Sequence, residues 1–521
     1  MFPYFSSGSK PTKKYTIAFK GINYSNNTQE GEFSETYNLS TKRYPCLAPR
    51  EGRVYSISTN PAQEVSTLFV KGDKLYMTNT DTDGKFKFME YGGGSIGEVE
   101  ETKKQIASVG NYILIFPDKK YYNVETKEFG NMEETYSQTG LVFKDSTITT
   151  TGADFPFRPG DGVTISGCSK EENNITIIIR EVNGNTLTFY ENSFTGATET
   201  GTVTIKREIP ELEFVCESGN RLWGVKGNTI YASKFSDPLN FKVFDGLTGD
   251  SYYIDVGSDG EFTGCIPYST YVCFFKENTL HKVYGNKPSN FQVNETKVFG
   301  VQSGSERSLQ AVNEMLIYKG VNGVYAYTGG VPTLISENFG NKRFSEASAC
   351  SDGEKYYISM KNGNTFGFYS YDIGRGIWLK EDDLRADDMV FYNNKVHLLR
   401  EYVEDDGVYR DVCYIDDDES KEAIEWSATF CPFNETINER KVYSKFHLRL
   451  DLAEGAWIAV DIKTNNDYKW RQVYVTHDSK AKTISIPIMP ERCDSIEVRI
   501  RGKRDCTIRS FVREYRTGSD V

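Results

Sequence analysis

Short hairpins recur along this chain, and their spacing is the feature that most limits its fold. The segment 220–241, NRLWGVKGNTIYASKFSDPLNF, has β-favouring residues on both sides of a Gly-Asn turn, which is typical of a hairpin. Six similar segments occur, and one residue in the first apolar strand of each unit marks its position: Leu75, Ile113, Leu222, Val272, Leu316, Tyr357 and His397. The spacings are about 38, 109, 50, 44, 41 and 40 residues, and a period of ~40–45 residues with about four short strands is typical of a β-propeller blade.

The repeat therefore predicts an all-β chain with a propeller of about seven blades. No 3.6-residue periodicity is visible, which argues against repeats built from helices. A large β-sandwich with evenly spaced hairpins is the alternative. Trp223, inside the 220–241 hairpin, is expected to pack between blades.

The irregular parts of the spacing divide the chain into domains. Residues 131–208 fill the long gap and contain a hairpin of their own around Asn183-Gly184, which predicts a small β-barrel inserted in a propeller loop. After residue 423, alternating strands follow at short intervals, as in a β-sandwich. We therefore expect an N-terminal arm (1–50), a propeller in two parts (51–130 and 209–423), the inserted barrel (131–208) and a C-terminal sandwich (424–521).

Composition and charge limit the function. The 34 Tyr and 32 Phe against 8 Met favour strands. No apolar run is long enough to span a membrane, no export signal is visible, and ten cysteines without a CxxC pair indicate reduced thiols in a cytoplasm. The net charge of -12 argues against a general nucleic-acid binder, although it is compatible with a wall past which DNA slides.

The charge is unevenly distributed between two segments. Residues 401–425 are strongly acidic and residues 492–516 strongly basic. Such runs are usually solvated faces, but the two segments are also candidates to meet, within one chain or between subunits. The subunit-interface candidates are Arg492, Arg499, Arg501, Arg504, Arg509, Asp416, Asp417 and Asp418.

One stretch has the pattern of a calcium loop. In NTDTDGKFKFME (79–90), the oxygens of Asn79, Asp81, Asp83 and Glu90 and the turn at Gly84 fit the spacing of calcium ligands. The flanks are strands, however, and an Asp-Gly hairpin turn explains the same residues. We therefore expect the protein to bind no metal and no cofactor. If it does bind calcium, Asn79, Asp81, Asp83 and Glu90 are the candidate ligands.

No constellation of catalytic residues stands out. The four histidines are spread over several elements, and Ser95 in GGSIG lacks the strand-turn-helix context of a nucleophile elbow. Carboxylate pairs such as Asp382-Asp383 and Asp387-Asp388 leave a glycosidase pair open without singling one out. The expectation is therefore a protein that is not an enzyme.

Three stretches resemble bacteriophage tail proteins of the nozzle or hub type. The run 19–53 resembles their opening, the 220–241 hairpin resembles one of their blade hairpins, and the ending 490–521 resembles closing strands of structural proteins in prophages of gut Firmicutes. The matching residues are Gly21, Ile22, Asn23, Asn38, Leu39, Pro45, Pro49 and Arg50 in the first run, and Asn220, Arg221, Leu222, Trp223, Tyr231, Ser233 and Phe241 in the second.

This resemblance implies a structural protein of the virion, assembled in the bacterial cytoplasm. It would form a homo-oligomeric ring, with six subunits, around the DNA exit channel at the distal tail tube. It would contact other tail proteins on the adaptor or portal side, as well as fibres, and let DNA pass without sequence-specific binding. Two alternatives remain: a receptor- or glycan-binding propeller, which predicts exposed aromatic pockets, and a polysaccharide-degrading glycosidase, which predicts two carboxyl groups ~5–9.5 Å apart.

Overall fold

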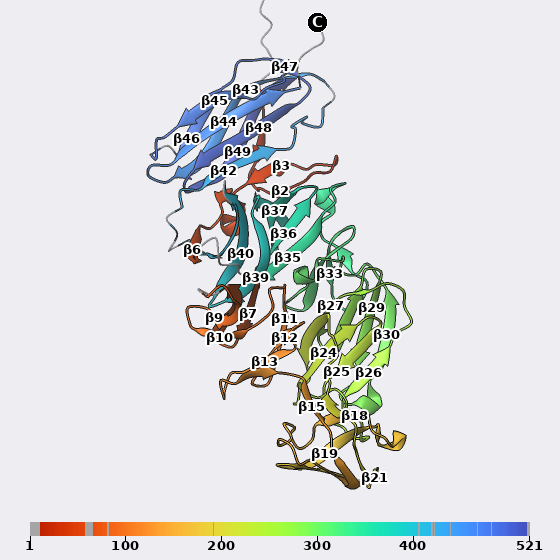
Figure 1. Ribbon diagram of the computed structural model, residues 1–521. Helices are drawn as coiled ribbons and strands as arrows, with labels where there is room; N and C mark the ends of the chain where they lie inside the picture. The colour runs from red at the N-terminus through yellow and green to blue at the C-terminus, as the bar shows by residue number, and fades with distance from the viewer. Residues whose placement is uncertain are drawn as a thin grey trace, which may run out of the picture. The chain divides into compact units, whose positions relative to one another are not determined.

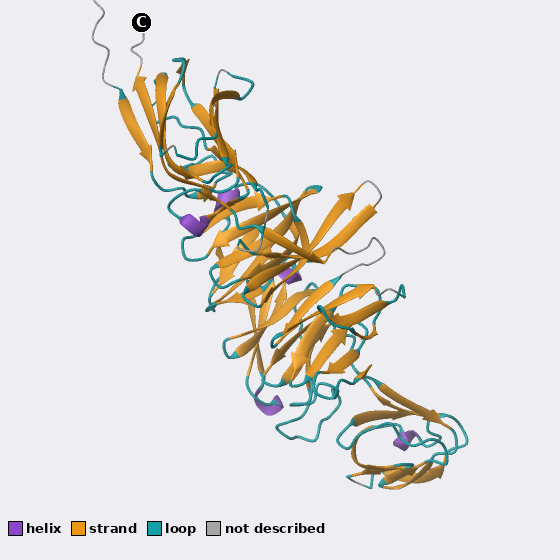
Figure 2. Ribbon diagram, turned by 90° about the vertical axis from the view of Figure 1, so that its left-hand side faces the viewer, coloured by secondary structure: helices purple, strands orange, loops and turns teal. Residues whose placement is uncertain are grey.

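The computed structural model describes residues 11–57, 66–80, 83–190, 192–404, 407–417, 420, 422–437, 439–465, 467–480 and 482–517. These residues form β-strands joined by loops and short 3-10 helices (Figure 2): η1 (Thr41–Arg43), η2 (Glu171–Asn173), η3 (Pro288–Asn290), η4 (Glu306–Ser308) and η5 (Glu337–Phe339). Within the described residues, no helix has the length and apolarity needed to cross a bilayer. The chain divides into two compact units, one of residues 1–61 and 317–521, the other of residues 62–316.

Seven four-stranded antiparallel sheets of the propeller-blade type account for much of the described chain (Figure 1). Four of them lie in unit 62–316. The first contains β7 (Thr67–Lys71), β8 (Lys74–Thr80), β9 (Phe86–Glu90) and β10 (Ser95–Glu98), and the second contains β11 (Gln105–Val109), β12 (Tyr112–Phe116), β13 (Lys120–Asn123) and β14 (Phe129–Asn131). The third contains β23 (Phe214–Ser218), β24 (Arg221–Lys226), β25 (Thr229–Ala232) and β26 (Tyr252–Asp255), and the fourth contains β27 (Phe262–Tyr268), β28 (Tyr271–Lys276), β29 (Thr279–Tyr284) and β30 (Gln292–Lys297).

The remaining three sheets follow along the chain. They are β31 (Gln310–Val312), β32 (Met315–Gly320), β33 (Gly323–Tyr327) and β34 (Thr333–Leu334); β35 (Ser345–Ser351), β36 (Lys355–Asn362), β37 (Thr365–Asp372) and β38 (Ile377–Asp382); and β39 (Arg385–Tyr392), β40 (Lys395–Glu404), β41 (Gly407–Ile415) and β6 (Arg53–Ile57). The last sheet is completed by β6 from the N-terminal part of the chain, which pairs with β41. The predicted fold class, all-β with about seven blades, an inserted barrel and a C-terminal sandwich, is confirmed.

The seven marker residues lie one in each sheet, but in its second strand rather than its first. The second strands are buried along most of their length, as in YILIF of β12 and YVCFFK of β28, because side chains cover both faces. The first strands lie beside one another, with β23 next to β11 and β27 in one unit and β35 next to β39 in the other. They carry smaller and more polar residues, as in SEASACS of β35, and therefore give a weaker apolar pattern.

The hairpin that defined the repeat is held by buried bonds from side chains to backbone. The guanidinium of Arg221 donates to the carbonyls of Ser233 at 2.7 Å and Thr248 at 2.9 Å. The Ser233 hydroxyl accepts the N–H of Leu222 at 3.0 Å. The Trp223 ring packs against Phe274 of β28 and against Phe291, which directly precedes β30 of the same sheet, with centroids 6.2 and 5.1 Å away, so its predicted position between blades is confirmed.

Residues 134–207 form the inserted barrel, an eight-stranded antiparallel sheet around a core of its own. Its strands, in sheet order, are β15 (Glu134–Gln138), β22 (Val203–Arg207), β18 (Gly162–Ser166), β19 (Thr176–Asn183), β20 (Thr186–Phe189), β17 (Thr147–Thr149), β16 (Val142–Asp145) and β21 (Phe194–Thr198). The predicted turn between β19 and β20 is present, with Gly184 at a φ of 53°, a conformation that favours glycine.

A buried polar cluster joins the barrel to the blade sheet β23–β26. Arg207 donates to Asp161 at 2.8 Å and to the carbonyl of Met132 at 3.0 Å. Asn240, in the loop between β25 and β26, donates to Asp161 at 3.0 Å and accepts the N–H of Gly162 at 3.0 Å. Because these groups are buried and bonded to one another, the barrel and this blade loop share one polar core.

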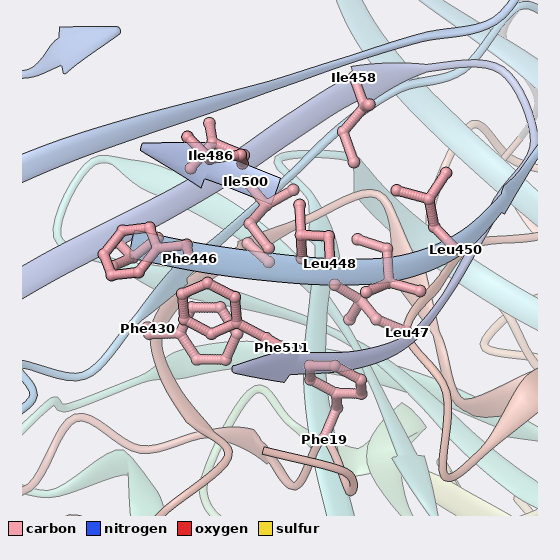
Figure 3. Close-up of a cluster of buried hydrophobic side chains, with 14 of the residues drawn as sticks. Phe19, Leu47, Phe430, Phe446, Leu448, Leu450, Ile458, Ile486, Ile500 and Phe511 are labelled. Carbon is pink, nitrogen blue, oxygen red and sulfur yellow. The ribbon is translucent and has the colours of Figure 1, made fainter. Parts of the chain in front are cut away.

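The C-terminal sandwich is built from both ends of the chain. One sheet contains β1 (Thr12–Thr16), β49 (Cys506–Thr517), β43 (Lys441–Leu452), β46 (Thr483–Pro487) and β47 (Arg492–Cys493). The other contains β2 (Gly21–Ile22), β3 (Glu32–Tyr37), β42 (Glu425–Phe430), β48 (Ile496–Lys503), β44 (Trp457–Thr464) and β45 (Arg471–Thr476), and a separate pair is formed by β4 (Leu39–Ser40) and β5 (Ala48–Pro49). Figure 3 shows its core, where Phe430, Phe446 and Phe511 meet Leu47 and Ile500. The described part of the stretch expected as an arm, residues 11–50, thus supplies strands to this sandwich.

The residues of the N-terminal run that resembles tail proteins have structural roles here. Asn38, at a φ of 56°, donates to the carbonyl of Glu425 at 2.7 Å and accepts from Arg50 at 2.7 Å. Gly21 has a φ of 91°, and a Cβ there would lie 2.4 Å from the carbonyl oxygen of Trp378. A side chain at this position would therefore clash with the backbone of β38.

Candidate functional site

The predicted calcium loop is occupied by ion pairs. Asp83 binds Lys87 at 2.7 Å, and both oxygens of Glu90 bind Lys74 at 2.6 and 2.8 Å. Asn79 is buried, and Asp81 lies outside the described residues. Among the described residues, no group of three or more His, Cys, Asp or Glu side chains is placed to hold a metal. The calcium assignment therefore has no support from the geometry of Asp83 and Glu90.

The acidic and basic segments meet within one chain. Glu425 pairs with Lys503 across β42 and β48, with a side-chain distance of 2.9 Å. Asp416 binds Lys395 at 2.5 Å and Asp417 binds Lys42 at 2.7 Å, whereas Asp418 lies outside the described residues. These acidic candidates already have partners in their own chain, and their role between subunits stays a prediction.

The basic candidates are likewise engaged within the sandwich. Arg499 and Arg501 both bind the carboxylate of Asp461, each at 2.8 Å, and Asp461 is only 2% exposed. Arg509 binds Asp451 at 2.6 Å on the surface, Arg492 begins the short strand β47, and Arg504 has a φ of 66° in the turn between β48 and β49. Since Asp461 is buried, Arg499 and Arg501 are needed within the sheet to compensate its charge. They are therefore less available to a neighbouring subunit.

Three of the four carboxylates in the pairs noted in the sequence have basic partners, and the fourth, Asp388, is buried. Asp382 is buried against Arg53, Asp383 binds Lys380 at 2.5 Å, and Asp387 binds Arg385 at 2.8 Å. Ser95 lies in a short exposed strand. None of these residues lines either of the two cavities described below, where a nucleophile or a general acid would be expected.

A cavity of about 260 Å³ lies among the first strands of unit 62–316. Residues of β7, β11, β23, β27 and β31 line it, which is the arrangement expected of strands around a propeller axis. Of its described lining residues, Glu306 is the one carboxylate, and it binds Lys103 at 3.2 Å. A glycosidase pair needs two carboxyl groups, and the described wall of this cavity supplies one.

A larger cavity of about 620 Å³ lies where the chain passes between the blades and the inserted barrel. We call it the aromatic pocket. One wall is formed by Tyr231, Phe241, Phe244 and Tyr253, from β25, β26 and the loop between them. Tyr253 is 57% exposed and Phe244 50% exposed, and their rings meet edge to face at 5.7 Å. Tyr231 stacks on Tyr253 at 6.4 Å, which fixes the ring orientation.

The rest of the lining of the aromatic pocket, which we call the charged wall, carries charges that are paired. Lys119 Nζ is 2.9 Å from Glu133 Oε1 and 2.5 Å from Glu211 Oε1, and Lys242 forms an ion pair with Glu208. Burial alone would raise the pKa of Glu133, but hydrogen bonds from Lys119 and from the N–H of Ile209 outweigh it and lower the pKa. Burial alone would lower the pKa of Lys119, but hydrogen bonds to Glu211 and Glu133 outweigh it and raise the pKa, so Lys119 and Glu133 are both charged at neutral pH.

This pocket was missed at the level of the sequence. Its walls come from residues 119–133, 176, 206–211 and 231–253, which lie far apart along the chain. The available signal was the aromatic alternation of TIYAS and SYYID beside the insertion boundary. Alternation locates a strand face, but it does not indicate which face borders the inserted domain.

Comparison with known proteins gives little beyond the fold. No family model and no curated protein matches the chain. Solved structures that resemble it include exo-β-1,3-galactanase of Phanerochaete chrysosporium (9% identity, 56% of this chain and 92% of that one, TM-score 0.21) and a Trypanosoma rangeli sialidase (8%, 96% and 96%, 0.24). An exported protein of Bacteroides fragilis is similar at the same level (8%, 55% and 95%, 0.26).

These names correct one expectation. The chain was expected not to be an enzyme, but two of the three solved structures named above are glycoside hydrolases, so that expectation is withdrawn. They agree with the glycosidase alternative better than with a tail protein. With TM-scores of 0.21 and 0.24, the similarity assigns neither an activity nor a substrate to this chain.

Proposed function

We propose that this protein is a propeller-bearing structural component of a bacteriophage tail, a nozzle or hub subunit around the DNA exit. The observation that carries the proposal is the structural role of the residues that resemble those proteins. Arg221, Ser233, Asn38 and Arg50 make buried bonds that hold a blade hairpin or the N-terminal run in place. A resemblance on such residues reflects how the backbone is built, so it supports a shared architecture, and the tail role follows from it by analogy.

In this proposal the protein acts through shape and charge. Blade sheets are rigid and leave few free strand edges, which suits a ring under mechanical load. A net charge of -12 would let DNA slide past without the salt-dependent affinity that phosphate contacts create. Ring closure needs two different surfaces on each subunit.

Imaging tests this role directly. The purified protein is examined by negative-stain electron microscopy, and phage particles are labelled with gold-conjugated antibodies against it. We expect closed rings with six-fold symmetry and label at the distal end of the tail. A protein that stays monomeric over a wide concentration range and labels no particle would refute the tail role.

A second candidate function is glycoside hydrolysis, and the aromatic pocket contains the observation that favours it. The distances from Lys119 place the two oxygens of Glu133 and Glu211 at most about 5.4 Å apart, so the pair is no wider than the ~5–5.5 Å carboxyl separation of retaining glycosidases. The lowered pKa of Glu133 disfavours it as the proton donor, so in this candidate Glu133 would be the nucleophile.

The hydrolysis candidate is tested by release of reducing sugar from bacterial surface polysaccharides. Glu133→Gln and Glu211→Gln are each expected to lower the rate at least 100-fold, because general acid-base and nucleophilic steps contribute on that scale. No release from any polysaccharide by the unaltered protein would remove this candidate, and the tail role would be unaffected.

A further inference from the structure

The aromatic pocket has the size and position of a binding site for a small molecule. Its volume of about 620 Å³ falls within the range of ~300–1,000 Å³ found for ligand pockets. It lies at the junction of the inserted barrel with the blade sheets, and domain junctions are frequent places for such sites. The junction is fixed by the buried contacts of Asp161 with Arg207 and Asn240, so the walls of the pocket are held in place.

The aromatic wall indicates a ligand with an apolar face. Phe244 and Tyr253 leave about half of their surface in water although each could bury ~150–250 Å². Their rings are nevertheless oriented by contact with one another and with Tyr231. An aromatic face is negatively polarised, and it attracts flat arrays of C–H groups such as those on one face of a pyranose ring.

The charged wall indicates a neutral ligand with many hydroxyl groups. Lys119 is shared by Glu133 and Glu211, and Lys242 is bound to Glu208, so an anion or a cation would have to break an ion pair to enter. A hydroxyl group can instead donate to a carboxylate and accept from a lysine without separating the pair. Hydrogen bonds to charged groups are stronger than those between neutral groups, which favours hydroxyl-rich ligands.

We propose that the aromatic pocket binds a neutral glycan. One pyranose ring stacks on Tyr253, with the ring of Phe244 against its edge, and its hydroxyl groups bond to Glu211 and Lys119 of the charged wall. The inference goes beyond the tail role and does not require hydrolysis: a glycan that binds and stays intact supports it, whereas release of sugar supports the second candidate function.

The test uses the full chain and a panel of defined oligosaccharides. Neutral oligomers of glucose, galactose, mannose and N-acetylglucosamine are compared with sialylated and sulfated glycans on an array, and binding is measured by saturation-transfer NMR. We expect at least one neutral glycan to bind. Tyr253→Ala and Phe244→Ala are each expected to weaken its Kd at least tenfold, since stacking on an aromatic ring is lost.

The matched control is Tyr190→Ala, which removes another exposed tyrosine, 63% exposed, outside the pocket lining. It should leave the Kd unchanged within twofold. A measurement on the unaltered protein covers the case in which a pocket variant does not fold: the neutral glycan should slow hydrogen exchange in 229–232 and 252–255. Binding restricted to anionic glycans, no binding to the panel, or an unchanged Kd in both folded pocket variants would overturn the inference.

Discussion

Replacing Asp161 with alanine is expected to loosen the inserted barrel from the blade sheet β23–β26. The carboxylate accepts hydrogen bonds from Arg207 at 2.8 Å, Asn240 at 3.0 Å and the N–H of Arg158 at 2.9 Å. The side chains of Asp161 and Arg207 are 3% and 2% exposed. Removing one partner of a buried ion pair costs about 3–5 kcal/mol, because the other charge stays buried without compensation. Arg207 keeps its bonds to the Met132 carbonyl, so we expect the lower end, about 3 kcal/mol.

Hydrogen exchange measures this loss where it occurs. A decrease of about 3 kcal/mol in the free energy of opening corresponds to a roughly 100-fold faster exchange of the amides in β18 and β22. The amides of β28, in the neighbouring blade sheet, should keep their protection. Asp154→Ala is the matched control, because Asp154 is an exposed aspartate of the same barrel. Less than a threefold change in β18 and β22 would refute the assignment of Asp161 as the group that joins the two parts.

Three further perturbations test the structure elsewhere. Arg499→Ala combined with Arg501→Ala should destabilise the sandwich by about 3 kcal/mol in urea unfolding, since Asp461 would be left buried and unpaired. Arg221→Met should cost about 2–3 kcal/mol, because buried carbonyls lose their donors, and should speed exchange in β24 and β25. Burial alone would raise the pKa of Glu30, but hydrogen bonds from the buried Arg513 of β49 lower it. The stabilisation that Glu30 contributes is therefore present above about pH 4.5 and is lost as the pH falls through its folded pKa. Glu30→Gln should then make the free energy of unfolding depend less steeply on pH in the acid range.

Each of these three predictions would be contradicted by a specific result. Arg509→Ala removes an exposed ion pair with Asp451 and should cost under about 1 kcal/mol; an equal loss in this variant and in the double variant would show that burial of Asp461 does not decide the effect. A stability loss below about 1 kcal/mol for Arg221→Met would contradict the role of its carbonyl bonds. If the pH profile of Glu30→Gln overlays that of the unaltered protein down to pH 3, Glu30 does not contribute to acid unfolding.

The sequence was sufficient to predict the repeat because the second strand of each blade sheet is buried on both faces. Leu75, Ile113 and Leu316 lie in apolar runs for that reason, and such runs recur wherever a sheet recurs. It did not reveal that β6 completes the last sheet or that β1 pairs with β49. Those pairings join residues hundreds of positions apart, and no local pattern encodes which distant edge a strand will find.

The candidate site was harder to predict for a related reason. Charge runs predicted contact between the acidic and basic segments, and Glu425 and Lys503 do meet within the chain. The sequence did not show that Asp461 lies beneath Arg499 and Arg501, because a single aspartate in a β-strand gives no sign of its neighbours across the sheet. The aromatic pocket, which needs several distant segments at once, had no signature that local reasoning could use.

The pairing of β6 with β41 also means that β6 must wait for its partner strand while the chain is being synthesised. β6 ends at Ile57 and its partner begins at Gly407, so about 350 residues must be made in between, which takes roughly 20–70 s at about 5–20 residues per second. During that interval β6 and β1 are unpaired strand edges, which are prone to pair with other chains. A polypeptide released early would keep those edges exposed for good. Fragments that end before β41 are therefore predicted to aggregate through the unpaired edges of β1 and β6.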